Sequence, residues 1–176
     1  MPNKTEIRIG GSGGQGVVLA GQILGKAAVF NGKNVLQTQT YGAEARGSLA
    51  RSEVIISDSR IGFPAVRKCD ILVVMNQESL DKHIQYLKEN GVLIVDSNVE
   101  KIPETKASVF KVPATETAKK TYGDSMYGNM VILGALAKIT KIVSEEAMEN
   151  TIRESVAERT VETNINAFRK GLELCE

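Results

Sequence analysis

Glycine is concentrated in one stretch of the sequence, GGSGGQGV at residues 10–17, where it occupies five of eight positions. The stretch lies between a predicted strand over residues 5–9 and a predicted apolar helix over 17–30. At such a junction the free backbone N–H groups and the helix dipole favour a bound anion, and glycine permits the close approach and positive φ angles that this requires. We therefore predict an anion-receiving turn formed by Gly11, Gly13, Gly14, Gln15 and Gly16. The side chain of Gln15 adds an amide that can donate and accept hydrogen bonds.

Two familiar ligands of glycine-rich turns are disfavoured by the residues around this one. The spacing of its glycines matches the dinucleotide pattern G-x-G-x-x-G, but an NAD site needs an acidic residue about 20 positions further on. No acidic residue occurs between Lys33 and Gly42. A P-loop needs Lys followed by Ser or Thr, whereas two valines follow Gly16. The remaining alternatives are another phosphate-bearing ligand, a contact with a partner chain, or close packing of strand on helix without a ligand.

A second polar motif, TYGAEARGSL at residues 40–49, lies between two predicted strands. The guanidinium of Arg46 offers a planar fork that suits a phosphate or a carboxylate, and Glu44 is placed to orient it or to bridge to a partner chain. The alternative is an exposed Glu–Arg loop that contributes under ~1 kcal/mol. The residues of this motif that we predict to take part in binding are Tyr41, Gly42, Glu44, Arg46 and Gly47.

Composition disfavours several classes of protein. The chain has 176 residues, 42% of them apolar, and its 22 basic residues nearly balance 21 acidic ones, for a net charge of +1. A nucleic-acid-binding protein usually shows a strong basic excess. No apolar run approaches the ~18 residues of a membrane span, and residues 1–10 carry no signal-peptide pattern. We therefore expect a cytoplasmic protein that binds neither nucleic acid nor a membrane.

The thiol and imidazole groups do not form a recognisable metal or catalytic set. The two cysteines, Cys69 and Cys175, lie far apart without a CxxC pair, so the chain offers no four-thiolate ligand set for zinc or an iron–sulfur cluster. We expect Cys69 to be a reduced, buried thiol. The single histidine, His83, lies in a predicted helix with a charged face, where we expect a solvated surface side chain.

Strands and helices alternate along the first two thirds of the chain, and the last third is helical. Continuous apolar segments such as DILVVM are typical of parallel strands buried on both faces. Strands are predicted at 5–9, 34–41, 50–57, 70–75, 91–97 and 107–113, and helices at 17–30, 77–90, 129–140 and 145–158, with a final helix carrying an apolar stripe from 161 to 172.

Asn129, at the start of one of these helices, is a further candidate binding residue. It is also a suitable N-cap for its helix, which is the simpler role.

These elements predict an α/β fold. We expect a single Rossmann-like domain over residues 1–176, with a mostly parallel sheet, helices on both faces and a helical C-terminal third. The segment 40–53 is expected to make an antiparallel excursion.

Several segments together resemble the gamma subunit of 2-oxoacid:ferredoxin oxidoreductases, over nearly the whole chain. They are GGSGGQGVVLAGQILGKAA, QTQTYGAEARGSLARSEVIIS, VPATETA, NMVILGALA and NINAFRKG. The joint presence of G-x-G-G-Q-G and Y-G-x-E-A-R-G is specific, whereas either motif alone is not. Within the family, QTQTYGAEARG is most similar to the 2-oxoglutarate type, and Ser48 stands where a second glycine or an alanine is common.

The resemblance implies an activity that this chain does not carry out alone. That activity is the coenzyme A-dependent oxidative decarboxylation of 2-oxoglutarate to succinyl-CoA and CO₂, with reduction of ferredoxin. The glycine turn is expected to face coenzyme A. Thiamine diphosphate, Mg²⁺ and iron–sulfur clusters are expected on partner subunits, because the string YGDSMYGN lacks the usual thiamine diphosphate motif and the cysteines are too few. We expect no catalytic and no metal-binding residue in this chain itself.

Two alternatives to this function stay open at the level of sequence. One is a gamma subunit that serves another 2-oxoacid, of the pyruvate, branched-chain or indolepyruvate type. The other is a free-standing Rossmann-like nucleotide-binding protein.

Overall fold

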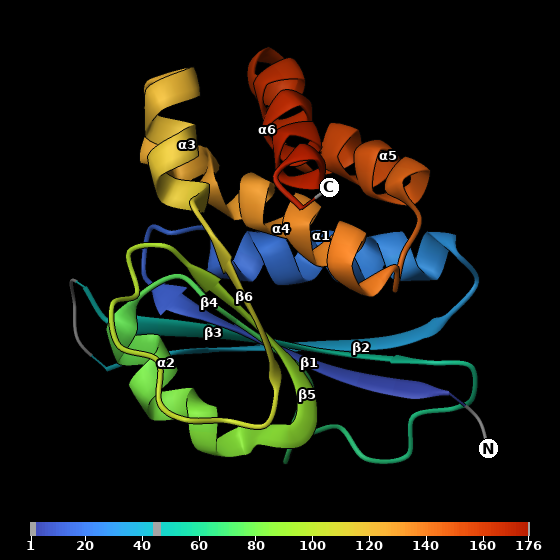
Figure 1. The fold of residues 1–176 in the computed structure, drawn as a ribbon. Coiled ribbons are helices and arrows are strands. Elements are labelled where there is room, and N and C mark those ends of the chain that lie inside the picture. Colours follow the sequence, from blue (N-terminus) through green and yellow to red (C-terminus); the bar gives the residue numbers. More distant parts are fainter. Residues whose placement is uncertain (1–2, 44–46, 176) are drawn as a thin grey trace.

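A six-stranded mixed sheet forms the centre of the molecule in the computed structural model, which describes residues 3–43 and 47–175 (Figure 1). The strands are β1 (Lys4–Ser12), β2 (Asn34–Tyr41), β3 (Leu49–Ser57), β4 (Cys69–Val74), β5 (Leu87–Asp96) and β6 (Ser108–Val112). Their order is β2-β3-β1-β4-β5-β6, and β3 runs antiparallel to both of its neighbours, while β1, β4, β5 and β6 pair in parallel. The expected antiparallel excursion in a mostly parallel sheet is therefore confirmed.

Helices cover both faces of this sheet, as expected, but unequally (Figure 1). In the described part of the chain, one face carries only α2 (Gln77–His83) and the short 3₁₀ turn η1 (Ile84–Tyr86) that continues it. The other face carries α1 (Val17–Phe30), α3 (Ala114–Tyr122), α4 (Gly128–Thr140), α5 (Glu145–Ser155) and α6 (Val161–Glu173), with the 3₁₀ turns η2 (Ser125–Tyr127) and η3 (Glu158–Thr160).

None of the helices in the described residues has the length and apolar character needed to span a bilayer.

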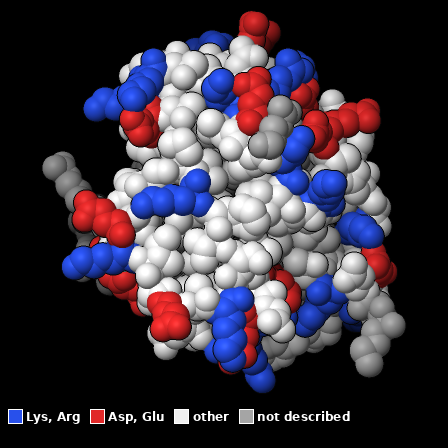
Figure 2. Space-filling view, viewed as in Figure 1, with Lys and Arg blue, Asp and Glu red and all other residues white. Residues whose placement is uncertain are grey.

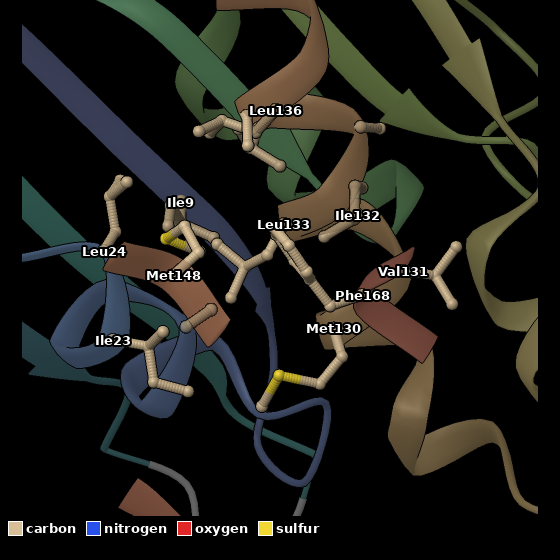
Figure 3. Packing of buried hydrophobic residues seen from close by; sticks show 14 of the residues in the cluster. Ile9, Ile23, Leu24, Met130, Val131, Ile132, Leu133, Leu136, Met148 and Phe168 are labelled. Carbon is tan, nitrogen blue, oxygen red and sulfur yellow. The ribbon is translucent and has the colours of Figure 1, made fainter. Parts of the chain in front are cut away.

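The larger of two apolar clusters lies between the sheet and the helices α1, α4, α5 and α6 (Figure 3). Strand side chains alternate between the two clusters: Ile71 and Val73 face the larger one, whereas Leu72 and Val74 face the smaller one beside α2. This alternation explains why the sequence of β4 is apolar without interruption, because both of its faces are covered. The face of the molecule seen in Figure 2, by contrast, carries both basic and acidic side chains, as the small net charge suggests.

Helix α4 is buried almost all round because α6 crosses directly over it. A Cβ atom on Gly134 would overlap the carbonyl oxygen of Phe168, and a Cβ atom on Gly171 would overlap that of Val131. The glycine pair therefore lets the two backbones touch. The apolar stripe predicted for the last helix packs here, where Ile165 and Phe168 are buried.

Several element boundaries differ from the sequence-based prediction, and two of these differences follow from strand pairing. Strand β1 continues through Gly10 and Gly11 to Ser12, because β3 provides backbone partners as far as the pair Ser12–Leu49. The predicted helix over 77–90 is wrong in its second half. The backbone leaves the helix after Tyr86, and β5 begins at Leu87, which pairs with Cys69 of β4. Tertiary pairing overrides the helical sequence pattern at this point.

The expectation of a solvated His83 is wrong. Its side chain is only 2% exposed, because α2 turns this residue toward β1, where a Cβ atom on Gly10 would lie 3.1 Å from His83 Cδ2. Burial, aided by the positive charges of Arg8 and Arg51, lowers the pKa of His83 to about 4. The expectation for Cys69 is confirmed: it is a buried free thiol, and burial raises its pKa to about 11.

We expect Gly134→Ala to destabilise the protein by about 1–2 kcal/mol. Alanine would gain about 1 kcal/mol of helix propensity. The new methyl group would, however, push α4 away from α6, and overpacking costs about 1–3 kcal/mol. The upper part of that range applies here, because the atoms that the methyl group would meet belong to the backbone of α6. Urea unfolding of the purified chain measures the change. The matched control is Gly62→Ala, whose Cβ atom meets open space and should shift stability by less than ~0.5 kcal/mol. Equal stability of the two variants would contradict close α4–α6 contact.

We expect His83 to make stability fall as the pH drops from about 6.5 toward about 4. The unfolded chain binds a proton on His83 below its ordinary pKa of 6.5, whereas the folded chain holds the imidazole neutral down to about 4. Since the unfolded state then binds more protons, acid favours unfolding in this window. Urea titrations at pH 7, 6, 5 and 4.5 should show a flatter pH dependence for His83→Gln than for the natural chain. Parallel curves would mean that His83 is not buried in the neutral form.

Candidate functional site

The glycine turn consists of residues 13–16 and joins β1 to α1. The Gln15 N–H donates to the Ser12 carbonyl at 3.1 Å, and both Gly14 (φ 91°) and Gly16 (φ 71°) adopt left-handed backbone conformations, which glycine reaches without steric cost. Gly16 caps α1 without any side-chain hydrogen bond, and the first turn of α1 contains no acidic residue. The positive end of the α1 dipole is therefore not offset by a nearby carboxylate of that helix, which favours a bound anion.

The glycines in the turn and just before it have different surroundings. A Cβ atom on Gly11 would lie 2.7 Å from Val17 Cγ2, and one on Gly16 would lie 2.8 Å from Asn129 Cγ, so both face packed protein. A Cβ atom on Gly14 would have nothing within 4 Å, and one on Gly13 would meet only the Ser48 carbonyl, at 3.6 Å. The open side of the turn is therefore at Gly13 and Gly14.

The side chain of Gln15 is used inside the protein. Its Oε1 accepts hydrogen bonds from the Ser12 N–H at 2.7 Å and from Asn76 Nδ2 at 3.2 Å, and its Nε2 donates to the Met75 carbonyl at 3.3 Å. These bonds tie the turn to the end of β4. Sequence reasoning missed Asn76, although an asparagine directly after a buried strand and before a helix is a recognisable N-cap signal.

Asn129 is not the N-cap of its helix, which corrects the simpler role predicted for it. Helix α4 begins one residue earlier, at Gly128, after the N-cap Tyr127. The Asn129 side chain is 4% exposed and donates from Nδ2 to the Gly16 carbonyl at 3.3 Å. The structure therefore brings Asn129 and the glycine turn together, over a sequence separation of 113 residues.

The second polar motif also reaches this turn. The Gly13 N–H donates to the Ser48 carbonyl, and the Gly42 N–H donates to the Leu49 carbonyl, both at 2.8 Å. Tyr41 ends β2 with its side chain 58% exposed, and Gly47 has a φ of 68°. The predicted site residues Glu44 and Arg46 lie outside the described residues.

The site therefore lies at the carboxyl ends of β1 and β4, which is where ligands bind in open α/β sheets. It offers backbone donors and a helix N-terminus rather than a set of acid–base side chains. Among the described residues, no group of three or more His, Cys, Asp or Glu side chains could hold a metal ion.

Known proteins resemble this chain over nearly its whole length. A family model described as pyruvate ferredoxin/flavodoxin oxidoreductase matches residues 6–174. The 2-oxoglutarate synthase subunit KorC of Methanocaldococcus jannaschii is 46% identical over 177 residues, which cover 98% of this chain and 95% of that protein.

Two solved structures share the fold. The gamma subunit of a keto/oxoacid ferredoxin oxidoreductase from Geobacter sulfurreducens has 43% identity and a TM-score of 0.87, with 97% of this chain and 98% of that chain covered. The 2-oxoglutarate:ferredoxin oxidoreductase of Magnetococcus marinus, solved with 2-oxoglutarate, coenzyme A and succinyl-CoA bound, has 24% identity and a TM-score of 0.88, with 98% of this chain and 31% of that chain covered.

The family match extends over nearly all of the chain, and the KorC relative matches it from end to end. The resemblance drawn from the two glycine-containing motifs is thereby confirmed. The chain belongs to the pyruvate ferredoxin/flavodoxin oxidoreductase family and is a homologue of the 2-oxoglutarate synthase subunit KorC.

Proposed function

We propose that this chain is the gamma subunit of a cytoplasmic 2-oxoglutarate:ferredoxin oxidoreductase. The complex would convert 2-oxoglutarate and coenzyme A to succinyl-CoA and CO₂ and pass two electrons to ferredoxin. The observation that carries the proposal is the 46% identity to KorC over 98% of this chain and 95% of that protein. The 2-oxoglutarate-like motif QTQTYGAEARG points to the same substrate.

The contribution of this chain to the reaction is an anion-receiving turn that faces coenzyme A. The open side at Gly13 and Gly14 lies beside the start of α1, whose dipole attracts negative charge. Coenzyme A carries several phosphate charges, so one of its phosphates is the natural anion for this place. Gln15 and Gly16 shape the turn, and Asn129 supports it from behind through the Gly16 carbonyl.

The second motif completes this site from the side of β2 and β3. Residues 48 and 49 of this motif lie between Gly42 and the glycine turn: the Gly42 N–H donates to the Leu49 carbonyl on one side, and the Gly13 N–H donates to the Ser48 carbonyl on the other. Tyr41 precedes Gly42 at the end of β2. We assign the guanidinium of Arg46 to a phosphate or carboxylate of the ligand, and we assign Glu44 to the orientation of Arg46 or to a contact with a partner chain.

Thiamine diphosphate, Mg²⁺ and the iron–sulfur clusters belong, in this proposal, to thiamine-binding and ferredoxin-like partner subunits. The residues of this chain do not suit them. In YGDSMYGN the Asp124 carboxylate accepts from the Met126 N–H at 2.9 Å and so caps η2. The chain has two cysteines, and Cys69 is buried with its thiol protonated at neutral pH. When bound on a partner, thiamine diphosphate supplies the carbanion chemistry of decarboxylation.

Isolation of the native complex tests this function. The chain should co-purify with larger cluster-bearing subunits, visible as a brown colour, and the complex should reduce ferredoxin with 2-oxoglutarate in preference to pyruvate, branched-chain 2-oxoacids or indolepyruvate. Preference for another 2-oxoacid would overturn the substrate assignment. A colourless chain that binds NAD or FAD by itself would overturn the subunit assignment.

We expect Gly14→Val to lower kcat/KM for coenzyme A in the assembled complex by at least about tenfold, a loss of ~1.4 kcal/mol of transition-state stabilisation. The valine would strain a left-handed backbone position and cover the open side of the turn. Gly32→Val is the matched control, because Gly32 has a similar φ of 77° and equally open surroundings but lies at the far end of α1. Steady-state kinetics at saturating 2-oxoglutarate measures both. Equal activity of the two variants would remove the turn from the mechanism.

We expect Arg46→Ala to raise the apparent KM for coenzyme A, because a charge-assisted contact of about 1.5–3 kcal/mol is lost. Arg46→Lys should recover part of that loss, since it keeps the charge but not the two-pronged hydrogen bond. Assembly of both variants is checked by gel filtration of the complex. An unchanged KM in an assembled Arg46→Ala complex would show that this guanidinium does not bind the ligand.

A further inference from the structure

Asn76 connects three separate parts of the structure at the candidate site. It follows β4 and is the N-cap of α2, where its Oδ1 accepts from the Ser79 N–H at 2.8 Å. Its Nδ2 donates to Ser12 Oγ at 2.6 Å and to Gln15 Oε1 at 3.2 Å. One amide side chain therefore joins the start of α2, the end of β1 and the glycine turn.

These bonds form part of a closed network on the inner side of the turn. The same Gln15 oxygen also accepts from the Ser12 N–H, and the Gln15 amide nitrogen donates to the Met75 carbonyl. The Met75 N–H in turn donates to the Gly10 carbonyl at 3.0 Å. The inner side of the turn is thus bonded to β4 and α2, while its outer side at Gly14 stays open.

We propose that Asn76 is a positioning residue for the glycine turn. Acting through Ser12 and Gln15, it holds the turn in the shape that presents the backbone donors of Gly14 and of the start of α1 to an anion. The proposal rests on the proposed function, in which that anion is a phosphate of coenzyme A. A hydrogen-bonded inner shell of this kind keeps a binding site preorganised, which lowers the cost of ligand binding.

The chemistry of the site explains why an asparagine is suited to this position. The side chain must accept a hydrogen bond to cap α2 and must also donate two hydrogen bonds, one to Ser12 at the end of β1 and one to Gln15 in the turn. Aspartate or serine can still cap a helix. An ionised aspartate has no proton to donate and would place a negative charge against Gln15 Oε1. A serine at this position can still cap α2, but it lacks the amide group that donates to Ser12 and Gln15.

The test uses Asn76→Ser and Asn76→Asp in the assembled complex. We expect Asn76→Ser to raise KM for coenzyme A by about threefold to tenfold, the loss of one or two hydrogen bonds, with kcat and KM for 2-oxoglutarate within about twofold of normal. Asn76→Asp should raise KM further, because its charge also repels the incoming phosphate. Both should melt within a few degrees of the natural complex, because the α2 cap is kept.

Two further variants separate positioning from general destabilisation. Ser12→Ala removes one acceptor of Asn76 without touching the α2 cap and should raise KM for coenzyme A in the same direction; it stands in if an Asn76 variant fails to assemble. Ser144→Ala removes the N-cap of α5, where Ser144 Oγ accepts from the Ala147 N–H at 3.2 Å. It should lower the melting temperature and leave KM for coenzyme A unchanged.

The outcomes distinguish this proposal from the function on which it rests. If Asn76→Ser, Asn76→Asp and Ser12→Ala all leave KM for coenzyme A unchanged while Gly14→Val impairs its use, Asn76 has no positioning role and the turn still binds. If the kinetics of Gly14→Val also match those of its control, the coenzyme A-facing turn itself is wrong. A rise in KM for Ser144→Ala equal to that for Asn76→Ser would attribute the effect to lost stability and overturn the positioning role.

Discussion

The antiparallel pairing of β3 with β1 is the interaction on which the candidate site depends. It places β3 between β1 and β2, with Ser12 of β1 opposite Leu49 of β3. The next backbone bond beyond this pair runs from the Gly13 N–H to the Ser48 carbonyl. Without the inserted strand, the glycine turn and the second polar motif would have no common edge.

The turn is then fixed from several directions at once. Gln15 and Asn76 bond its inner side to β4 and α2, and Asn129 bonds it to α4 through the Gly16 carbonyl. Each of these side chains is an amide, which can donate and accept without carrying a charge. Among the described residues of the candidate site, a neutral frame of this kind does not offset the positive end of the α1 dipole, which favours an anionic ligand.

The distribution of chemistry in the chain is consistent with its place in a multi-subunit family. Among the described residues, the titratable groups with the largest pKa shifts are His83 and Cys69, which are buried and whose pKa values are shifted away from reactivity. The described part of the candidate site offers backbone donors and amides, which do not transfer protons at neutral pH. In the proposed function, the redox and carbanion chemistry belongs to partner subunits, and this chain shapes the approach of coenzyme A.

The sequence by itself determined the fold class, most elements and the family. Continuous apolar strands, a glycine-rich strand–helix junction and the cap at Ser144 are local patterns, and the structure confirms each of them. Five segments together identified the family, and the joint presence of the two glycine-containing motifs was the most specific part of that resemblance.

Only the tertiary structure decided how the pieces meet. The extension of β1 through Gly11, the early end of the α2 segment, the burial of His83 and the contact of Asn129 with Gly16 all depend on partners far away in the chain. The role of Asn76 is of the same kind, since its bonds to Ser12 and Gln15 span more than 60 residues. Local sequence patterns indicate helix and strand preference and the positions of helix caps. Long-range hydrogen bonds and close backbone contacts arise only when the sheet has formed and has brought these segments together.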